Sequence, residues 1–232
     1  MPLLVTDAVV LHLFDYLETS RILRLATRDG GIQSVVAKGA RRPRSRYGSA
    51  LDLFAQGTAS IHTRPGRDLQ TLASFDVTRS RSELGDDLDR FTAASAISEL
   101  ALRFGGEDAS ASLYDAIVVA LDAIAGSPLG APEGARTAAL AGAWRLISEM
   151  GFAPALDICG SCHDGLAPDE TVTFSHPAGG ALCARCSGLR AGARTLPPAA
   201  RDTLRGWLSG EQSPLSGLAE SRAHQRLLRE FV

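Results

Sequence analysis

The stretch RILRLATRDGGIQSVVA, residues 21–37, decides the fold of the first part of the chain. Residues 21–26 contain the apolar Ile22, Leu23 and Leu25, and they are followed by the turn Asp29-Gly30-Gly31 and then by a second run over residues 32–37. Two runs of this length around an Asp-Gly turn are typical of a β-hairpin. The sequence therefore predicts that the N-terminal part is built of β-strands.

Strand signals continue on both sides of this hairpin. Residues 6–15 alternate loosely between apolar and polar, and residues 51–63 and 69–78 predict a second hairpin around the turn RPGRD at residues 64–68. Five short strands joined by turns suit a small barrel. An OB-like barrel is favoured by the strand count and by a span of about 80 residues, while an SH3-like barrel fits the same pattern.

The periodicity becomes helical from Asp86 onward. Apolar residues between Leu88 and Phe104 recur at three- and four-residue intervals, and the pattern returns over residues 113–125 and 135–150. Stripes of this kind are typical of core packing rather than of a cofactor pocket. Two later helices are predicted, one that opens at Pro197-Pro198 and runs through Leu208, and one over residues 218–231.

Four cysteines form two matched pairs, Cys159-Gly-Ser-Cys162 and Cys183-Ala-Arg-Cys186, and the chain has no others. The 20 residues between the inner members suit a tetrahedral zinc site, because each Cys-x-x-Cys turn directs two thiolates at one ion. We therefore expect one structural Zn²⁺ held by Cys159, Cys162, Cys183 and Cys186, with no ligand from the nearby His163 or His176.

The sequence disfavours three other uses of these cysteines. Disulfides are disfavoured because the start of the chain lacks the basic region of a secretion signal. A thioredoxin-like redox site needs a single Cys-x-x-Cys that opens a helix in a βαβ unit. A catalytic zinc would keep one coordination position open, which four cysteines fill.

These patterns together predict an α+β, multi-domain chain. We expect an OB-fold β-barrel over residues 1–80, an all-α helical domain over residues 81–154 that resumes at residues 193–232, and an inserted four-cysteine zinc module over residues 155–192. The hydrophobic content of 45% is ample for buried cores. No uncharged apolar run reaches about 18 residues, so we expect no membrane span and a cytoplasmic protein.

The net charge of −2 conceals a segregation of charge along the chain. Residues 1–82 carry 12 basic and 7 acidic side chains, whereas residues 83–150 carry 4 and 11. The basic excess is concentrated in the segment KGARRPRSRYG, residues 38–48, which we call the basic loop and which has five cations in nine residues. Nearly all of them are arginines, whose guanidinium groups form forked hydrogen bonds with phosphate oxygens.

The basic loop predicts nucleic-acid binding. The expected contacts are Lys38, Arg41, Arg42, Arg44 and Arg46, and Arg64 and Arg67 extend the positive field if the barrel forms. Tyr47 is either a stacking surface for an unpaired base or a half-buried anchor of the loop. Arg222, Arg226 and Arg229 can share one helix face, for which solvation is the commoner explanation.

Three stretches resemble the bacterial RecO recombination-mediator proteins. They are residues 37–48 with the basic loop, the preceding Tyr16-Leu17-Glu18, and GFAPALDICGSC at residues 151–162. The resemblance implies an N-terminal OB-fold, a central helical domain and, in many members, a four-cysteine zinc finger.

This resemblance also implies a function. RecO proteins act without enzymatic chemistry in DNA repair and recombination, at the nucleoid. They bind single- and double-stranded DNA, anneal complementary strands, form a complex with RecR, and help RecA displace single-stranded-DNA-binding protein. The resemblance assigns the DNA contact to the basic loop, whereas Arg64 and Arg67 rest on the barrel argument alone.

Two other classes of function stay open. A metal-dependent enzyme is disfavoured because the sequence has no His-Glu-x-x-His or nucleophile-elbow pattern, so we expect no enzyme. A zinc-containing protein-interaction scaffold, in which the basic loop is merely solvated, is the stronger rival. It predicts that removing the charges of the loop leaves every activity intact.

Overall fold

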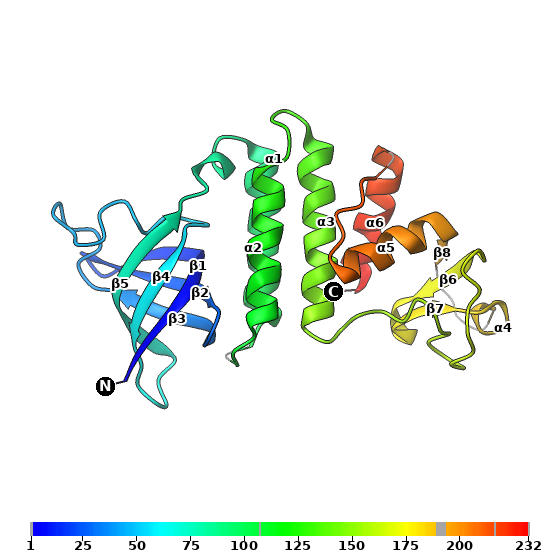
Figure 1. Ribbon diagram of the computed structural model, residues 1–232, viewed down its shortest axis with the longest axis horizontal. Helices are drawn as coiled ribbons and strands as arrows, with labels where there is room; N and C mark the ends of the chain where they lie inside the picture. Colours follow the sequence, from blue (N-terminus) through cyan, green and yellow to red (C-terminus); the bar gives the residue numbers. More distant parts are fainter. Residues whose placement is uncertain (1, 107, 189–193, 216, 232) are drawn as a thin grey trace. The chain divides into compact units, whose positions relative to one another are not determined.

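The structure of the chain is a computed structural model that describes residues 2–106, 108–188, 194–215 and 217–231 (Figure 1). The chain divides into two compact units, Met1–Ala139 and Leu140–Val232. The boundary expected at residues 192–193 lies outside the described residues. In the part of the chain that the structure describes, no helix combines the length and apolar character needed to cross a bilayer.

Five strands close into a barrel in the first unit, as Figure 1 shows in blue to cyan. They are β1 (Leu3–Tyr16), β2 (Ser20–Thr27), β3 (Gly31–Ala37), β4 (Gln56–His62) and β5 (Leu69–Arg79), in the order β1-β2-β3-β5-β4. Neighbouring strands are antiparallel except β3 and β5, which run parallel. The predicted OB-like barrel is confirmed.

Strand β1 pairs along both of its edges. Residues 3–9 lie against β4, and residues 8–16 lie against β2, with a shift of register between Val10 and His12. Such a bulge bends a strand and increases its twist, which lets one strand serve two neighbours. Alternate side chains point inward, and Val10, Leu23, Val35 and Ile61 are fully buried in the barrel core.

The predicted hairpin over residues 21–37 is confirmed, and its turn is held by local hydrogen bonds. Gly31 has a φ of 62°, a conformation that glycine adopts without strain. The Thr27 hydroxyl donates to the carbonyl of Gly31 (2.8 Å) and accepts from the N–H of Gly30 (3.1 Å). The hydroxyl of Thr6, on β1, donates to the Asp29 carboxylate at 2.8 Å and ties the turn to the barrel.

The strand predicted over residues 51–63 is wrong at its start, because β4 begins only at Gln56. Leu51 and Phe54 are instead buried in an irregular segment, and Phe54 has a φ of 62°. The backbone there bonds to the bend in β1: Phe54 donates to Val10 (2.8 Å), and Val10 donates to Ala55 (2.9 Å). The apolar residues that suggested a strand cover the core without pairing as one.

The predicted helices are present. In the first unit they are α1 (Leu88–Phe104) and α2 (Ala111–Ala125), followed by α3 (Pro132–Glu149), which crosses the boundary of the units. The carboxylate of Asp87 accepts the N–H groups of Arg90 and Asp89 and caps α1, and these bonds, that of Arg90 foremost, lower its pKa. The hydroxyl of Ser110 caps α2 in the same way.

A buried arginine joins the barrel to these helices. Arg81 follows β5, and its side chain is fully buried. Its guanidinium donates to Asp122 on α2 (2.7 Å), to the amide oxygen of Gln56 (2.6 Å) and to the carbonyl of Phe54 (3.0 Å). Its φ of 51° is uncommon for a residue with a side chain, so this network holds the backbone in a costly conformation.

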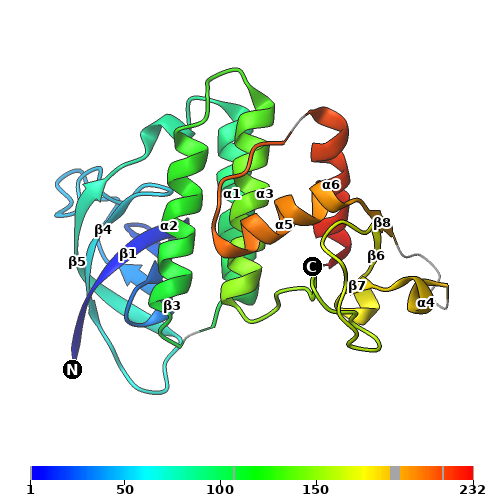
Figure 2. The same ribbon diagram turned by 45° about the vertical axis from the view of Figure 1, so that its right-hand side comes forward.

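The second unit combines a small sheet with helices. Strands β6 (Val172–Ser175), β7 (Gly180–Leu182) and β8 (Arg194–Leu196) pair in the order β7-β6-β8. Helix α4 (Ala184–Ser187) follows β7, while α5 (Pro198–Ser209) and α6 (Leu218–Phe231) follow β8. Figure 2 shows α5 and α6 next to β8, and residues of these three elements line one common groove.

The end of α6 is held against this sheet by aromatic and ionic contacts. The ring of Phe231 lies 5.3 Å from that of Trp144 and 6.0 Å from that of Phe174. The Glu230 carboxylate accepts from Arg194 on β8 (2.7 Å) and lies 3.1 Å from His176. The bond from Arg194 lowers the pKa of Glu230 to about 2, so this carboxylate is ionised at neutral pH.

We expect Arg81→Met to lower the free energy of unfolding by about 2–4 kcal/mol, because it leaves buried acceptors without a donor. Arg79→Met is the matched control. Arg79 also lies 3.2 Å from Asp122, but its side chain is 47% exposed, so we expect a loss below about 1 kcal/mol. Urea unfolding at one pH measures both, and equal losses would contradict the role given to the buried network.

Candidate nucleic-acid interface and metal centre

One groove at the surface of the barrel is lined by residues from all five strands and the turns between them. Its volume is about 500 Å³. The register of the strands places its residues in a row, with Tyr16 opposite Ser20, Val36 opposite Thr71, and Thr71 opposite His62. Residues far apart in the sequence therefore meet in one groove. The strands and turns that build it correspond to the ligand-binding face of OB-folds.

The charge of this groove has one sign. Lys38, Arg42, Arg64 and Arg67 are among its lining residues, which include no aspartate or glutamate. The sequence predicted these four cations as DNA contacts, and the structure brings them together. A concave surface with cations and no carboxylate concentrates positive potential, which attracts polyanions.

The turn that carries Arg64 and Arg67 is fixed by one side chain. The amide oxygen of Gln70 accepts from the N–H of Arg64 (2.7 Å), and its amide nitrogen donates to the carbonyls of Arg64 (3.3 Å) and Arg67 (2.5 Å). Gly66, at the tip, has a φ of 74°. The turn therefore presents both arginines from a defined backbone.

The other three predicted cations lie outside the groove lining. Arg41 lies 3.4 Å from Asp15 and donates to the carbonyl of Glu18 at 3.5 Å. Arg46 donates to the Tyr47 hydroxyl (2.8 Å) and to the carbonyl of Leu72 (3.3 Å). Arg44 is exposed on the basic loop.

Tyr47 anchors the basic loop and does not offer a stacking surface. It is only 5% exposed, and its hydroxyl donates to the carbonyl of Leu72 on β5 at 2.8 Å. The anchoring alternative is therefore confirmed. Tyr16, Leu17 and His62 were not predicted as site residues, although they line the groove. Tyr16 and Leu17 could have been found from their position at the end of a strand, next to a turn.

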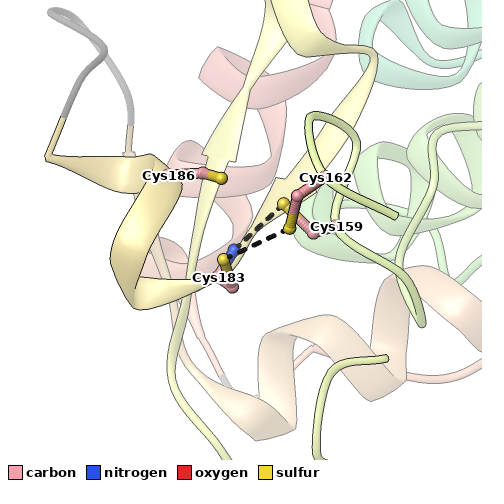
Figure 3. Close-up of side chains that lie close together, drawn as sticks. All are labelled: Cys159, Cys162, Cys183 and Cys186. Carbon is pink, nitrogen blue, oxygen red and sulfur yellow. Dashed lines mark hydrogen bonds between the residues drawn. The ribbon is translucent and has the colours of Figure 1, made fainter. Parts of the chain in front are cut away.

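The four cysteines converge in the second unit. Figure 3 shows Cys159 and Cys162 on the loop before β6, and Cys183 and Cys186 around the start of α4. Their sulfur atoms all lie within 4.8 Å of one another, and those of Cys162 and Cys183 are 3.7 Å apart. Sulfurs bound to one zinc ion are about 3.8 Å apart, because a tetrahedral Zn–S bond is about 2.3 Å long. The geometry fits a four-cysteine metal site.

The ionisation of these cysteines to thiolates also favours a bound cation. Burial alone would raise the pKa of Cys159, but the N–H groups of Cys162, Cys183 and Ser161 outweigh it and lower this pKa to about 6. The N–H of Asp164 lowers the pKa of Cys162, yet neighbouring sulfurs and burial raise it to about 12. Four thiolates therefore repel one another unless a cation lies between them, and thiolates are the form that binds metal.

The histidines near the cysteines are not needed as ligands. Among the described residues, the group that could hold a metal ion consists of the four cysteines. His176 lies against Glu230 and Phe174, on the contact between the sheet and α6. A set of four thiolates suits a thiophilic divalent cation such as zinc and fills its tetrahedron.

Two family models match the chain. Residues 1–81 match the family described as Recombination protein O N terminal, and residues 85–232 match Recombination protein O C terminal. The DNA repair protein RecO of Rubrobacter xylanophilus is 31% identical over 233 residues, 100% of this chain and 90% of that protein. The DNA repair protein RecO of Anaeromyxobacter sp. strain K is 38% identical over 197 residues, 83% of this chain and 73% of its own length. The chain therefore belongs to the RecO family of recombination and DNA repair proteins.

Proposed function

We propose that this chain is a non-enzymatic, DNA-binding mediator of recombination whose barrel groove holds a DNA strand by its phosphates. The observation that carries the proposal is the convergence of Lys38, Arg42, Arg64 and Arg67 on a groove without a carboxylate. Phosphate contacts supply most of the affinity in binding that does not depend on sequence. Membership of a DNA repair family supports DNA as the polyanion.

The remaining cations of the basic loop have a supporting role in this proposal. Arg41, Arg44 and Arg46 extend the positive field beyond the groove. The pair between Arg41 and Asp15 is exposed, and exposed ion pairs contribute little, so a phosphate can compete with that carboxylate. Arg46 holds Tyr47 and thereby keeps the loop in place.

This mode of binding suits strand annealing. A strand held by its phosphates keeps its base edges free to pair with a second strand. We propose that the chain binds single- and double-stranded DNA, anneals complementary strands, and acts with RecR to help RecA displace single-stranded-DNA-binding protein. Membership of the family supports this proposal. We propose that the chain acts at the nucleoid in the cytoplasm, where its proposed DNA substrate lies.

We propose that Cys159, Cys162, Cys183 and Cys186 hold one structural Zn²⁺. Four thiolate ligands leave no open position for water or substrate, so the ion would stabilise the fold rather than act in a reaction. The hairpin of β6 and β7 ends at Cys183, and β6 also contributes Phe174, which packs on the end of α6. Metal binding in this unit would thus stabilise the contact with α6 as well.

The groove is tested by the triple variant Arg42→Gln, Arg64→Gln and Arg67→Gln. We expect weaker binding to single-stranded oligonucleotides of every sequence, and a salt slope, d log K/d log [salt], that is shallower by about 2, since each lost phosphate contact contributes about 0.7. The measurement is a salt titration by fluorescence anisotropy.

The control for this experiment is Arg222→Gln, Arg226→Gln and Arg229→Gln, which removes the same charge from exposed positions of α6. We expect little change in affinity or slope. If the groove variant retains the slope of the unmodified protein, the groove is not the DNA site and the interaction-scaffold alternative gains support. If the α6 variant loses more, DNA lies against the C-terminal helix.

The metal site is tested by Cys159→Ser, with Ser161→Ala as a control inside the same loop. We expect the cysteine variant to lose bound zinc, measured by elemental analysis, and to become more sensitive to proteolysis within residues 140–232, because metal binding contributes to folding. DNA affinity should change little, since the cations of the groove lie in the other unit. Full zinc content in Cys159→Ser would show that other residues are the ligands.

A further inference from the structure

Exposed rings follow the outer face of β1 toward the groove. His12, Phe14 and Tyr16 occupy alternate positions of the strand, and alternate side chains of a strand point to the same side. Phe14 is 44% exposed and Tyr16 is 38% exposed. The rings of His12 and Phe14 lie 5.8 Å apart. The strand thus presents rings to solvent where it enters the basic groove, which Tyr16 itself lines.

Apolar side chains of the neighbouring strands lie beside these rings, and two of them, Ile22 and Val36, are largely covered, with 9% and 8% of their surface exposed. Phe14 lies opposite Ile22, and Ile22 lies opposite Val36, which also lines the groove. The core of the barrel takes the alternate residues Leu23 and Val35, so Ile22 and Val36 point to the outer face. The result is an apolar row across three strands with Lys38 and Arg42 at its end.

We propose that Phe14 and Tyr16 stack against unpaired bases of the strand whose phosphates the groove cations hold. This inference rests on the proposed function. Bases offer flat faces that stack on aromatic rings whatever the sequence, and cations next to the rings fit the phosphates of the same strand. A duplex keeps its base faces inside the helix, so it can use the cations but not the rings.

A single strand can use both the stacking rings and the cations, so the barrel prefers single strands to duplexes. This preference also gives annealing a direction, because a strand that pairs with its complement withdraws its bases from Phe14 and Tyr16. The duplex product is then held by phosphate contacts alone. The barrel binds the substrate of annealing more tightly than the product and releases the product as it forms.

The experiment compares Phe14→Ala and Tyr16→Ala with Phe104→Ala, a control at a ring that is 39% exposed at the end of α1. Affinity for a single-stranded oligonucleotide and for the corresponding duplex is measured over a salt series. We expect each β1 variant to bind the single strand about 5- to 150-fold more weakly, with the same salt slope and nearly unchanged duplex affinity. Phe104→Ala should bind both as the unmodified protein does.

A second readout reports stacking directly. A fluorescent adenine analogue in the oligonucleotide should change its emission on binding to the unmodified protein and to Tyr16→Phe, which keeps the ring, and less on binding to Tyr16→Ala. Circular dichroism and thermal unfolding show that the variants are folded.

The contrary outcomes separate this inference from the proposed function. Unchanged single-strand affinity in both β1 variants overturns the stacking role and leaves the groove in place. Equal losses for single strand and duplex also overturn it, because the rings would then only support the barrel. If the unmodified protein binds neither form of DNA, the groove proposal fails as well, and the exposed rings are a surface for a protein partner.

Discussion

The pairing of β1 on both of its edges is the constraint on which the first unit depends. A strand that lacks a neighbour leaves backbone donors and acceptors unpaired, and the bend between Val10 and His12 lets residues 3–9 of β1 pair with β4 and residues 8–16 pair with β2. Closure then fixes the register of every other strand. Because of that register, the end of β1 reaches the same groove as β3 and the turn between β4 and β5. The strand order of the barrel therefore brings the cations of the groove together.

Local patterns were enough to predict much of this fold. The Asp-Gly turn and the helical stripes depend on residues only a few positions apart, so they can be recognised in the sequence. The predicted strand extends back to residue 51, but burial without strand pairing satisfies the apolar Leu51 and Phe54 equally. The buried network of Arg81 could not be predicted from local sequence patterns, since its partners Gln56 and Asp122 are distant in the chain.

In the candidate sites too, local patterns could be predicted from the sequence and contacts between distant residues could not. The cysteine pairs were predicted because two short turns determine where their sulfurs point. For the basic loop, composition identified the cations but not their partners. Arg41 lies beside Asp15 and Arg46 beside Tyr47, whereas Lys38 and Arg42 line the groove, and only the folded conformation of the loop distinguishes these cases. The alternation of residues along β1 predicts that its rings lie on one face of the strand. It does not predict that this face meets a ligand.

The anchoring of Tyr47 has a consequence for recognition. The segment between β3 and β4 contains many turns, and such a segment would ordinarily sample a broad ensemble of conformations. The bond from the Tyr47 hydroxyl to Leu72, together with the buried Leu51 and Phe54, restricts that ensemble as the chain folds. The conformational entropy of ordering this segment is therefore lost during folding rather than on association. Under the proposed function, a DNA strand would meet a groove whose shape already exists, so more of the contact energy would remain as affinity.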